Sequence, residues 1–104
     1  MKRFLIQYTF HPDSGLVEDW HRQVAAFIAS LDSDPVLRGR IAYHCMKAIE
    51  GQNYYHLAEP RDDEAAKLLS QRDYFKRYTD DIKRVGGGVV SVIPLETIAE
   101  TSAG

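Results

Sequence analysis

Short runs with a hydrophobic period of two alternate along this chain with longer runs that have a period of three to four. Residues 4–10 place most of their large apolar side chains on one face, which predicts a strand. After several turn-forming residues, 16–31 repeat apolar side chains every three or four positions, which predicts an amphipathic helix that ends before Pro35. Asp13 or Ser14 is expected to cap the start of this helix.

The next two apolar runs are short and lie close together. Residues 41–49 and 53–58 each predict a strand, and the turn that joins them has the length of a hairpin turn. The sequence therefore predicts that these two strands pair in antiparallel fashion.

A longer helical pattern follows in residues 62–85. It is expected to break near Ser70, which is followed three residues later by Asp73, at the spacing of a capping box. The glycines at 86–88 end the helix, and 89–93 predict a last strand. Because the glycines follow a helix instead of preceding one, they indicate a turn and not a phosphate-binding loop.

The order strand, helix, strand, strand, helix, strand is the split β-α-β pattern of a ferredoxin-like α+β fold, with a four-stranded antiparallel sheet. The length of 104 residues fits one domain, which we place at residues 1–100, followed by a flexible tail at 101–104. Both faces of 41–49 carry apolar groups, yet two helices can cover only one face of a sheet. The sequence thus predicts a homodimer through the sheet faces, onto which residues 95–98 could cross.

Charge and composition narrow the range of partners. The net charge is −2, and the lysines and arginines are scattered, so the sequence predicts binding neither to nucleic acid nor to an anionic membrane. No apolar run approaches the roughly 20 residues needed to cross a bilayer. The single cysteine, Cys45, cannot form an internal disulfide, and no leader-like segment is evident at the start, so we expect a cytoplasmic protein with a small-molecule partner.

The order of elements, the length and the segment 62–78, including its Phe75-Lys76-Arg77-Tyr78 run, resemble the dimeric α+β barrel superfamily and its antibiotic biosynthesis monooxygenase-like branch. The resemblance implies a dimeric barrel and an activity among monooxygenases, isomerases, haem-degrading proteins or stress-induced proteins. It also implies a Trp near the end of the third strand of monooxygenases, where this chain has 57–60 without one. Gln7 in the first strand and a second helix without His argue against haem cleavage.

Histidines are the first candidates for chemistry, since imidazole exchanges protons near neutral pH. His44 and His56 lie on the two paired strands, and if they share a face they could act as an acid/base pair, with Tyr55 as a hydrogen-bond donor. The alternative is a structural pair of imidazoles at the dimer interface. No third ligand is evident, so no metal site is predicted. His11 could reach the mouth of a cavity or be a solvated loop residue.

Aromatic side chains are the second group of candidates. A cavity between sheet and helices would bind a flat aromatic or quinone-like molecule, or the same residues could simply pack the core and the interface. The candidate lining residues, besides His11, are Tyr8, Trp20, Tyr43, Tyr54, Phe75 and Tyr78. Cys45 is expected to be a small apolar filler.

These features predict a small cofactor-independent, monooxygenase-like enzyme that acts on an aromatic, polyketide-like or quinol-like molecule. In such chemistry the substrate itself reduces oxygen, so the protein supplies a dry pocket, a base and hydrogen-bond donors. Two alternatives remain open: a non-catalytic dimeric ligand-binding or stress-associated protein, and an isomerase or lyase that uses a histidine base.

Overall fold

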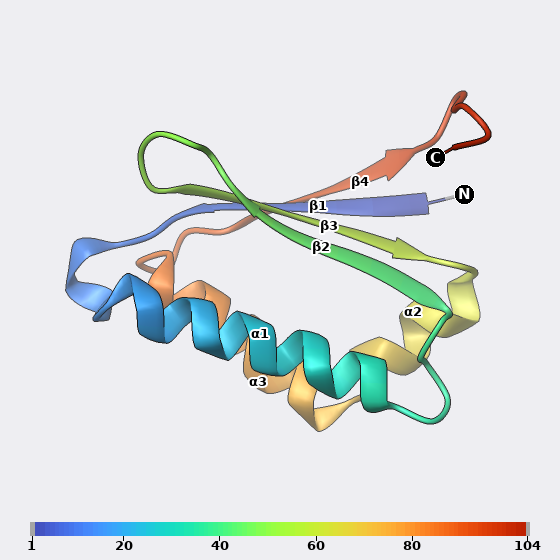
Figure 1. Ribbon diagram of the computed structural model, residues 1–104, viewed down its shortest axis with the longest axis horizontal. Helices are drawn as coiled ribbons and strands as arrows, with labels where there is room; N and C mark the ends of the chain where they lie inside the picture. Colours follow the sequence, from blue (N-terminus) through green and yellow to red (C-terminus); the bar gives the residue numbers. More distant parts are fainter. Residues whose placement is uncertain (1, 104) are drawn as a thin grey trace.

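Four antiparallel strands form one sheet in a computed structural model that describes residues 2–103 (Figure 1). The strands are β1 (Lys2–Thr9), β2 (Ile41–Lys47), β3 (Asn53–Pro60) and β4 (Ser91–Glu96). Their order is β2-β3-β1-β4, so β1 and β3 are central and the hairpin partner β2 lies at one edge. The expected ferredoxin-like α+β fold is confirmed.

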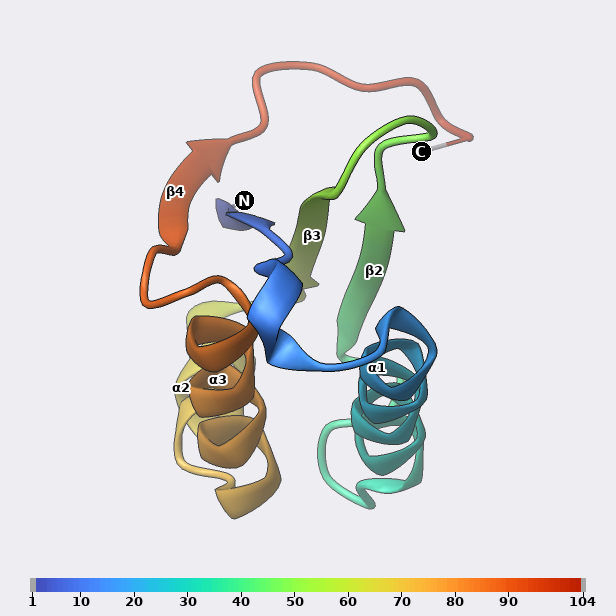
Figure 2. The same ribbon diagram turned by 90° about the vertical axis from the view of Figure 1, so that its left-hand side faces the viewer.

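The helices form a second layer on one face of this sheet. They are α1 (Val17–Ser33), α2 (Asp63–Ser70) and α3 (Asp73–Val85), with a short 3₁₀ turn, η1 (Pro12–Ser14), before α1. Figure 2 shows α1 beneath the β2 side of the sheet, and α2 and α3 beneath the β4 side.

The strand register decides which side chains meet the helices, because directly paired residues share a face. Tyr8 pairs with Tyr54, and Cys45 pairs with His56, so these four point toward the helices. The core between the layers is rich in aromatic side chains, and Trp20 of α1 is only 2% exposed. Phe27 of α1 stacks on Tyr78 of α3, with 3.8 Å between the ring centroids. Tyr8 and Tyr54 form a second stacked pair, with 5.1 Å between their centroids.

The break in the long helix is confirmed, but its predicted chemistry is wrong. Ser70 is the last residue of α2, and its hydroxyl donates to the carbonyl of Lys67 within the same helix. Arg72 precedes α3 without a capping side chain. The start of α1 likewise has no side-chain cap, because Leu16 occupies that position while Asp13 and Ser14 belong to η1.

Asp34 joins the end of α1 to the start of α3. Its buried carboxylate accepts hydrogen bonds from the backbone N–H groups of Val36 and Leu37, from Arg72 at 2.9 Å and from the hydroxyl of Tyr74 at 2.8 Å. Burial alone would raise the pKa of this carboxyl, but the hydrogen bonds from Tyr74 and Arg72 and from the backbone prevail and hold the pKa at about 2. This cluster fixes the break between α2 and α3.

The last strand begins and ends later than predicted, at Ser91–Glu96 instead of 89–93. Val89 belongs to the glycine turn, since its N–H donates to the carbonyl of Gly86. Gly86 itself lies so close to the strand that a Cβ would stand 3.3 Å from the Cβ of Tyr8. The turn is therefore held against the end of β1.

No helix within residues 2–103 covers the outer face of the sheet, and both apolar and charged side chains lie on it. Leu5 pairs with both Leu57 and Ile93 across three strands, which forms an apolar strip. At one end of the strip, Glu59 accepts hydrogen bonds from Arg3 at 2.7 Å and lies 3.0 Å from His44. The expected apolar second face is thus present, while dimerisation through it stays a prediction.

Candidate functional site

An apolar cleft opens between the sheet and the α2–α3 pair. Its larger part has a volume of about 350 Å³, within the range of small-molecule sites. A second hollow of about 210 Å³ continues it toward the glycine turn, and the two share the side chains of Ile6, Tyr43, Phe75, Thr79 and Val92. We call both together the sheet–helix cleft. Its remaining lining residues are Phe4, Ile41, Ala58, Pro60, Ala66, Leu69, Ser70, Ile82, Lys83 and Val90.

The cleft follows from the patterns of the elements that enclose it. Strand alternation points Ile6, Tyr43 and Val92 toward the helices. Phe75 and Thr79 lie one helical turn apart on α3, so both face the same way. The break after Ser70 turns α3 away from the line of α2, which leaves the space between the two helices and the sheet open.

Few groups in this cleft can do chemistry. Lys83 is the only charged residue among its lining residues, and Tyr43, Thr79 and Ser70 carry the only hydroxyls. Thr79 and Ser70 use their hydroxyls to donate to carbonyls of their own helices. The cleft wall is therefore almost wholly apolar, and Tyr43 and Phe75 contribute their rings to it.

A buried hydrogen-bonded network lies next to Tyr43. His56 is fully buried, and its Nε2 lies 2.9 Å from the hydroxyl of Tyr8 while its Nδ1 lies 2.8 Å from the hydroxyl of Tyr78. Trp20 donates to the Tyr8 hydroxyl at 2.9 Å, and Cys45 lies 3.6 Å from the Tyr78 hydroxyl. All described buried polar side-chain atoms have a partner.

The network is neutral. Burial lowers the pKa of His56 to about 4, so the imidazole carries no charge near neutral pH. Burial also raises the pKa of the Tyr8 and Tyr78 phenols far above their ordinary value. Because both ring nitrogens of His56 are engaged, this imidazole cannot take a proton directly from a ligand.

The three residues expected to be catalytic do not come together. His44 pairs with Leu57, whereas His56 pairs with Cys45, so the two imidazoles point to opposite faces of the sheet. The condition for an acid/base pair, a shared face, is not met. Tyr55 lies on the outer face, and His44 contacts Glu59 there at 3.0 Å. The two histidines are one position out of register, and a shift of one position places a side chain on the opposite face of the sheet.

The residues expected to bind substrate lie in four different places. Tyr43 and Phe75 line the sheet–helix cleft. Trp20 and Tyr78 belong to the buried network. His11 lies on the exposed loop, where its Nδ1 accepts from the N–H of Asp13, and its ring packs over Gly87.

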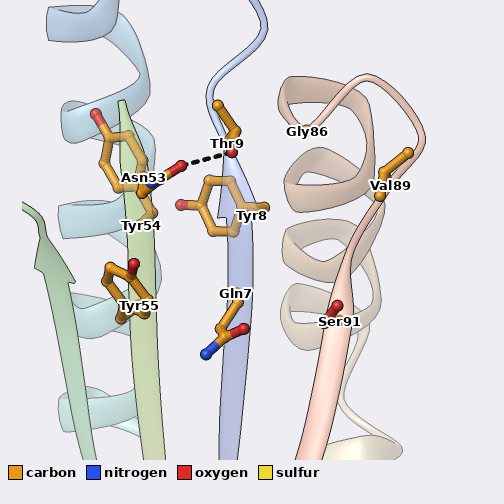
Figure 3. A pocket seen from close by; sticks show the side chains of 9 residues that line it. All are labelled: Gln7, Tyr8, Thr9, Asn53, Tyr54, Tyr55, Gly86, Val89 and Ser91. Atoms are coloured by element: carbon orange, nitrogen blue, oxygen red, sulfur yellow. Dashed lines mark hydrogen bonds between the residues drawn. The ribbon is translucent and has the colours of Figure 1, made fainter. Parts of the chain in front are cut away.

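Tyr8 and Tyr54 line a different and more polar hollow of about 320 Å³, at the end of the sheet where β4 stops pairing with β1 (Figure 3). In this view the side chains of β3 and β1 stand on one side, and the glycine turn and Ser91 stand on the other. Thr9 of β1 donates to the side chain of Asn53 on the neighbouring strand β3 at 2.6 Å. No group in this hollow is charged.

Sequence reasoning missed several cleft residues, notably Leu69, Thr79 and Lys83. The sequence indicates two of them only weakly, because Thr79 and Lys83 follow Phe75 at intervals of four, along the edge of the α3 apolar stripe. Within residues 2–103, no cluster of three His, Cys, Asp or Glu side chains could hold a metal ion. Among the same residues, no helix is long and apolar enough to span a bilayer.

Similar folds occur among solved structures. Rv0793 from Mycobacterium tuberculosis superposes with a TM-score of 0.77 at 14% identity, over 97% of this chain and 98% of that one. An antibiotic biosynthesis monooxygenase gives 0.76 at 13% identity, with 95% and 100% covered. SnoaB from Streptomyces nogalater, a cofactor-independent oxygenase, gives 0.76 at 12% identity, with 97% and 96% covered.

At such low identity the likeness shows the fold alone, and at that level the expected resemblance to antibiotic biosynthesis monooxygenase-like proteins is confirmed. Neither a protein-family model nor a curated protein sequence matches this chain.

Proposed function

We propose that this protein is a small-molecule enzyme of the cofactor-independent monooxygenase kind, which binds a flat, acidic aromatic molecule in the sheet–helix cleft. The observation that carries the proposal is the cleft itself, an apolar space of about 350 Å³ with the rings of Tyr43 and Phe75 in its walls. Apolar, partly aromatic walls suit an aromatic ligand better than a sugar, a nucleotide or an amino acid. The folds of the similar structures, one of them a cofactor-independent oxygenase, support the general kind.

The proposed reaction converts an acidic CH₂ group that lies between aromatic rings into a ketone. The substrate first loses a proton, and its anion transfers electrons to dioxygen as a carbon–oxygen bond forms. The resulting peroxide loses the second hydrogen of the CH₂ group, and its oxygen–oxygen bond breaks to give the ketone and one water. The carbon supplies all four electrons that dioxygen takes up, so the reaction needs no external reductant.

The protein's part in this scheme is limited by what lines the cleft. No carboxylate and no accessible imidazole lies among the lining residues, so the substrate must be acidic enough to ionise without a strong base. The apolar side chains of Phe75 and Leu69 keep water from that part of the cleft and so protect the peroxide from side reactions. The histidines His44 and His56 are not assigned as bases here, because His44 lies on the other face and His56 is fully buried.

Oxygen uptake with anthrone, a flat tricycle with an acidic CH₂ group, tests the proposal. We expect protein-dependent uptake of one dioxygen per anthraquinone formed. Thr79→Trp should abolish it, because Thr79 is an exposed α3 residue whose enlarged side chain would fill the cleft. Asp80→Trp is the matched control, since Asp80 is equally exposed on the same helix but does not line the cleft.

The second candidate is a non-catalytic binding protein, and the lack of a base in the cleft favours it. Binding of anthraquinone that Thr79→Trp removes, without any acceleration of anthrone oxidation, would establish this function instead. Equal activity of the two tryptophan variants would contradict both candidates, because each needs an open cleft.

We also infer that the outer sheet face mediates a homodimer. Its apolar strip through Leu5, Leu57 and Ile93 is left uncovered by the helices of the same chain. A second copy would bury this strip by the same surface on both subunits, as two-fold symmetry requires.

A further inference from the structure

Two buried tyrosines stack face to face, and each phenol is hydrogen-bonded to an imidazole of its own. The rings of Tyr8 and Tyr54 lie within 5° of parallel, with 5.1 Å between their centroids. The Tyr8 hydroxyl lies 2.9 Å from Nε2 of His56, and we call these two residues the inner pair. The Tyr54 hydroxyl lies 2.8 Å from Nε2 of His21, and these two form the outer pair. The function proposed above uses neither pair.

The proton of Tyr8 can be placed by counting donors and acceptors, because an unmatched buried polar group is costly. The indole of Trp20 only donates, so the Tyr8 oxygen accepts from it at 2.9 Å. Among residues 2–103, the Tyr8 proton then has one acceptor within hydrogen-bond distance, Nε2 of His56. His56 carries its own proton on Nδ1 and donates it to Tyr78, whose hydroxyl lies 3.6 Å from the sulfur of Cys45. The phenolic proton of Tyr8 therefore points at a base.

The outer pair has the same arrangement at the protein surface. The Tyr54 side chain is 4% exposed, and within residues 2–103 its hydroxyl has no hydrogen-bond partner other than His21. The phenolic proton of Tyr54 therefore also has a base beside it. His21 is an exposed residue of α1, so its imidazole exchanges protons with water.

A phenol that is hydrogen-bonded to a base is easier to oxidise than an isolated phenol. Loss of one electron makes the phenol a very strong acid, and its proton passes along the existing hydrogen bond to the base. In the inner pair this charges His56, which is fully buried and whose pKa burial holds at about 4. In the outer pair the charge lies on the exposed His21. The missing electron is therefore more stable on Tyr54 than on Tyr8.

The two pairs connect the sheet–helix cleft with the polar hollow at the end of β4. Tyr43 lines the cleft, and its ring meets those of His56 and Tyr78 edge to face, with 6.1 Å between centroids in each case. At the other end, Tyr8 and Tyr54 both line the hollow (Figure 3). The other side chains of this hollow present hydroxyl and amide groups and no charge, which suits a small hydroxylated molecule.

We propose that the two tyrosine–histidine pairs pass single electrons from a small hydroxylated reductant in the polar hollow to an oxidising radical in the sheet–helix cleft. Hydroquinone represents this class of reductant. A substrate radical that escapes coupling in the cleft adds dioxygen to become a peroxyl radical, which is an oxidant of the required class. The inference goes beyond the proposed function, because it assigns a second, protective activity and a second binding site.

Each step moves one electron and accounts for every proton. The peroxyl radical takes an electron from Tyr8 and a proton from water and becomes a hydroperoxide, while the Tyr8 proton moves to Nε2 of His56. Tyr54 then gives an electron to Tyr8, which takes its proton back, and the Tyr54 proton moves to Nε2 of His21. Hydroquinone gives Tyr54 an electron and releases a proton to water, and Tyr54 recovers its own proton. The net change is one hydrogen atom moved from hydroquinone to the peroxyl radical.

Flash photolysis with a ruthenium polypyridyl complex attached at the cleft tests this path. Thr79→Cys in a Cys45→Ala background places the complex on an exposed residue that lines the cleft. A flash, with persulfate as the electron acceptor, turns the complex into a one-electron oxidant. A tyrosyl radical should appear by transient absorption, and hydroquinone should shorten its lifetime.

Two pairs of variants assign the path. Tyr54→Phe keeps the stacked ring but should abolish the effect of hydroquinone, whereas Tyr55→Phe should not, because Tyr55 lines the same hollow and has no imidazole partner within residues 2–103. His21→Gln should slow the reaction with hydroquinone by about a hundredfold, the lower end of what a positioned base contributes. Its control is Arg22→Gln, on the same exposed turn of α1. Added imidazole should restore part of the rate in His21→Gln, which a merely structural role would not allow.

Three results would overturn the inference. Absence of a tyrosyl radical after the flash would mean that the cleft is not connected to the pairs. Equal effects of hydroquinone in Tyr54→Phe and Tyr55→Phe would mean that the electron does not pass through Tyr54. Equal rates in His21→Gln and Arg22→Gln would mean that the outer imidazole takes no proton. The assay contains neither anthrone nor dioxygen, so these results leave the proposed oxygenase function untouched, and a failure of oxygen uptake with anthrone leaves the electron path untouched.

Discussion

Protonation of His56 should destabilise this protein at mildly acidic pH. The imidazole is fully buried between Tyr8 and Tyr78, and its pKa is lowered from 6.5 to about 4 by burial. In the unfolded chain the same imidazole binds a proton below about pH 6.5. The unfolded state therefore binds more protons between these two values, and stability must fall as the pH is lowered through this range.

The size of the effect follows from the two pKa values. A shift from 6.5 to about 4 corresponds to roughly 3 kcal/mol, at about 1.4 kcal/mol for each tenfold change in proton affinity. This contribution is complete above pH 6.5 and is lost progressively down to about pH 4. Asp34 does not contribute in this window, because its carboxyl, with a pKa of about 2 in the fold and 3.8 as its ordinary value, loses its contribution only at lower pH.

Urea unfolding of the wild type and of His56→Gln, at one protein concentration and at several pH values, measures the effect. His56→Gln should be the less stable protein near neutral pH, and the difference should shrink by roughly 3 kcal/mol as the pH falls to about 4. A difference that does not change with pH would refute the reasoning. If the variant does not fold, a titration of the wild type by NMR replaces it, and there a His56 that protonates near its ordinary pKa would be the refuting result.

Other substitutions test the remaining parts of the fold. Asp34→Asn should cost about 1–3 kcal/mol by urea unfolding, because a neutral amide weakens the charge-assisted hydrogen bonds from Arg72 and Tyr74. The exposed neighbour Asp32→Asn should cost little. Gly86→Ala should cost about 1–3 kcal/mol, since its Cβ would stand 2.8 Å from the carbonyl oxygen of Val89. In Gly88→Ala the new Cβ would have no other atom within 4 Å. Only the strain of a positive φ should therefore lower the free energy of unfolding, by about 1–2 kcal/mol. Leu57→Lys should give a monomer by light scattering if the outer sheet face forms the dimer; an unchanged mass would contradict that interface.

The fold was predictable because its signals are local and repeated. Alternation in 4–10 and the helical stripe of 16–31 each extend over several residues, so an error at one position does not change the element. The ends of elements were less predictable. Ser70 has the spacing of a capping residue, but its hydroxyl donates to a carbonyl within α2. The turn formed by the three glycines includes Val89, so β4 begins only at Ser91.

The candidate site was predictable only in part, because the face of the sheet on which a side chain lies depends on the register of strand pairing. Tyr43 and Phe75 were found from their residue type and stripe, and both line the cleft. Whether His44 and His56 share a face depends on the exact register of the hairpin, which the sequence does not determine. The path from Trp20 to Tyr78 joins four separate elements, and no spacing along the chain reveals it.

A crystal structure of the protein with anthraquinone, the product of the proposed reaction, tests the central claim most directly. The account predicts the tricycle in the sheet–helix cleft, flat between Phe75 and Val92 and in contact with the ring of Tyr43. Anthraquinone in the polar hollow beside Thr9, or on the outer face of the sheet, would contradict the account.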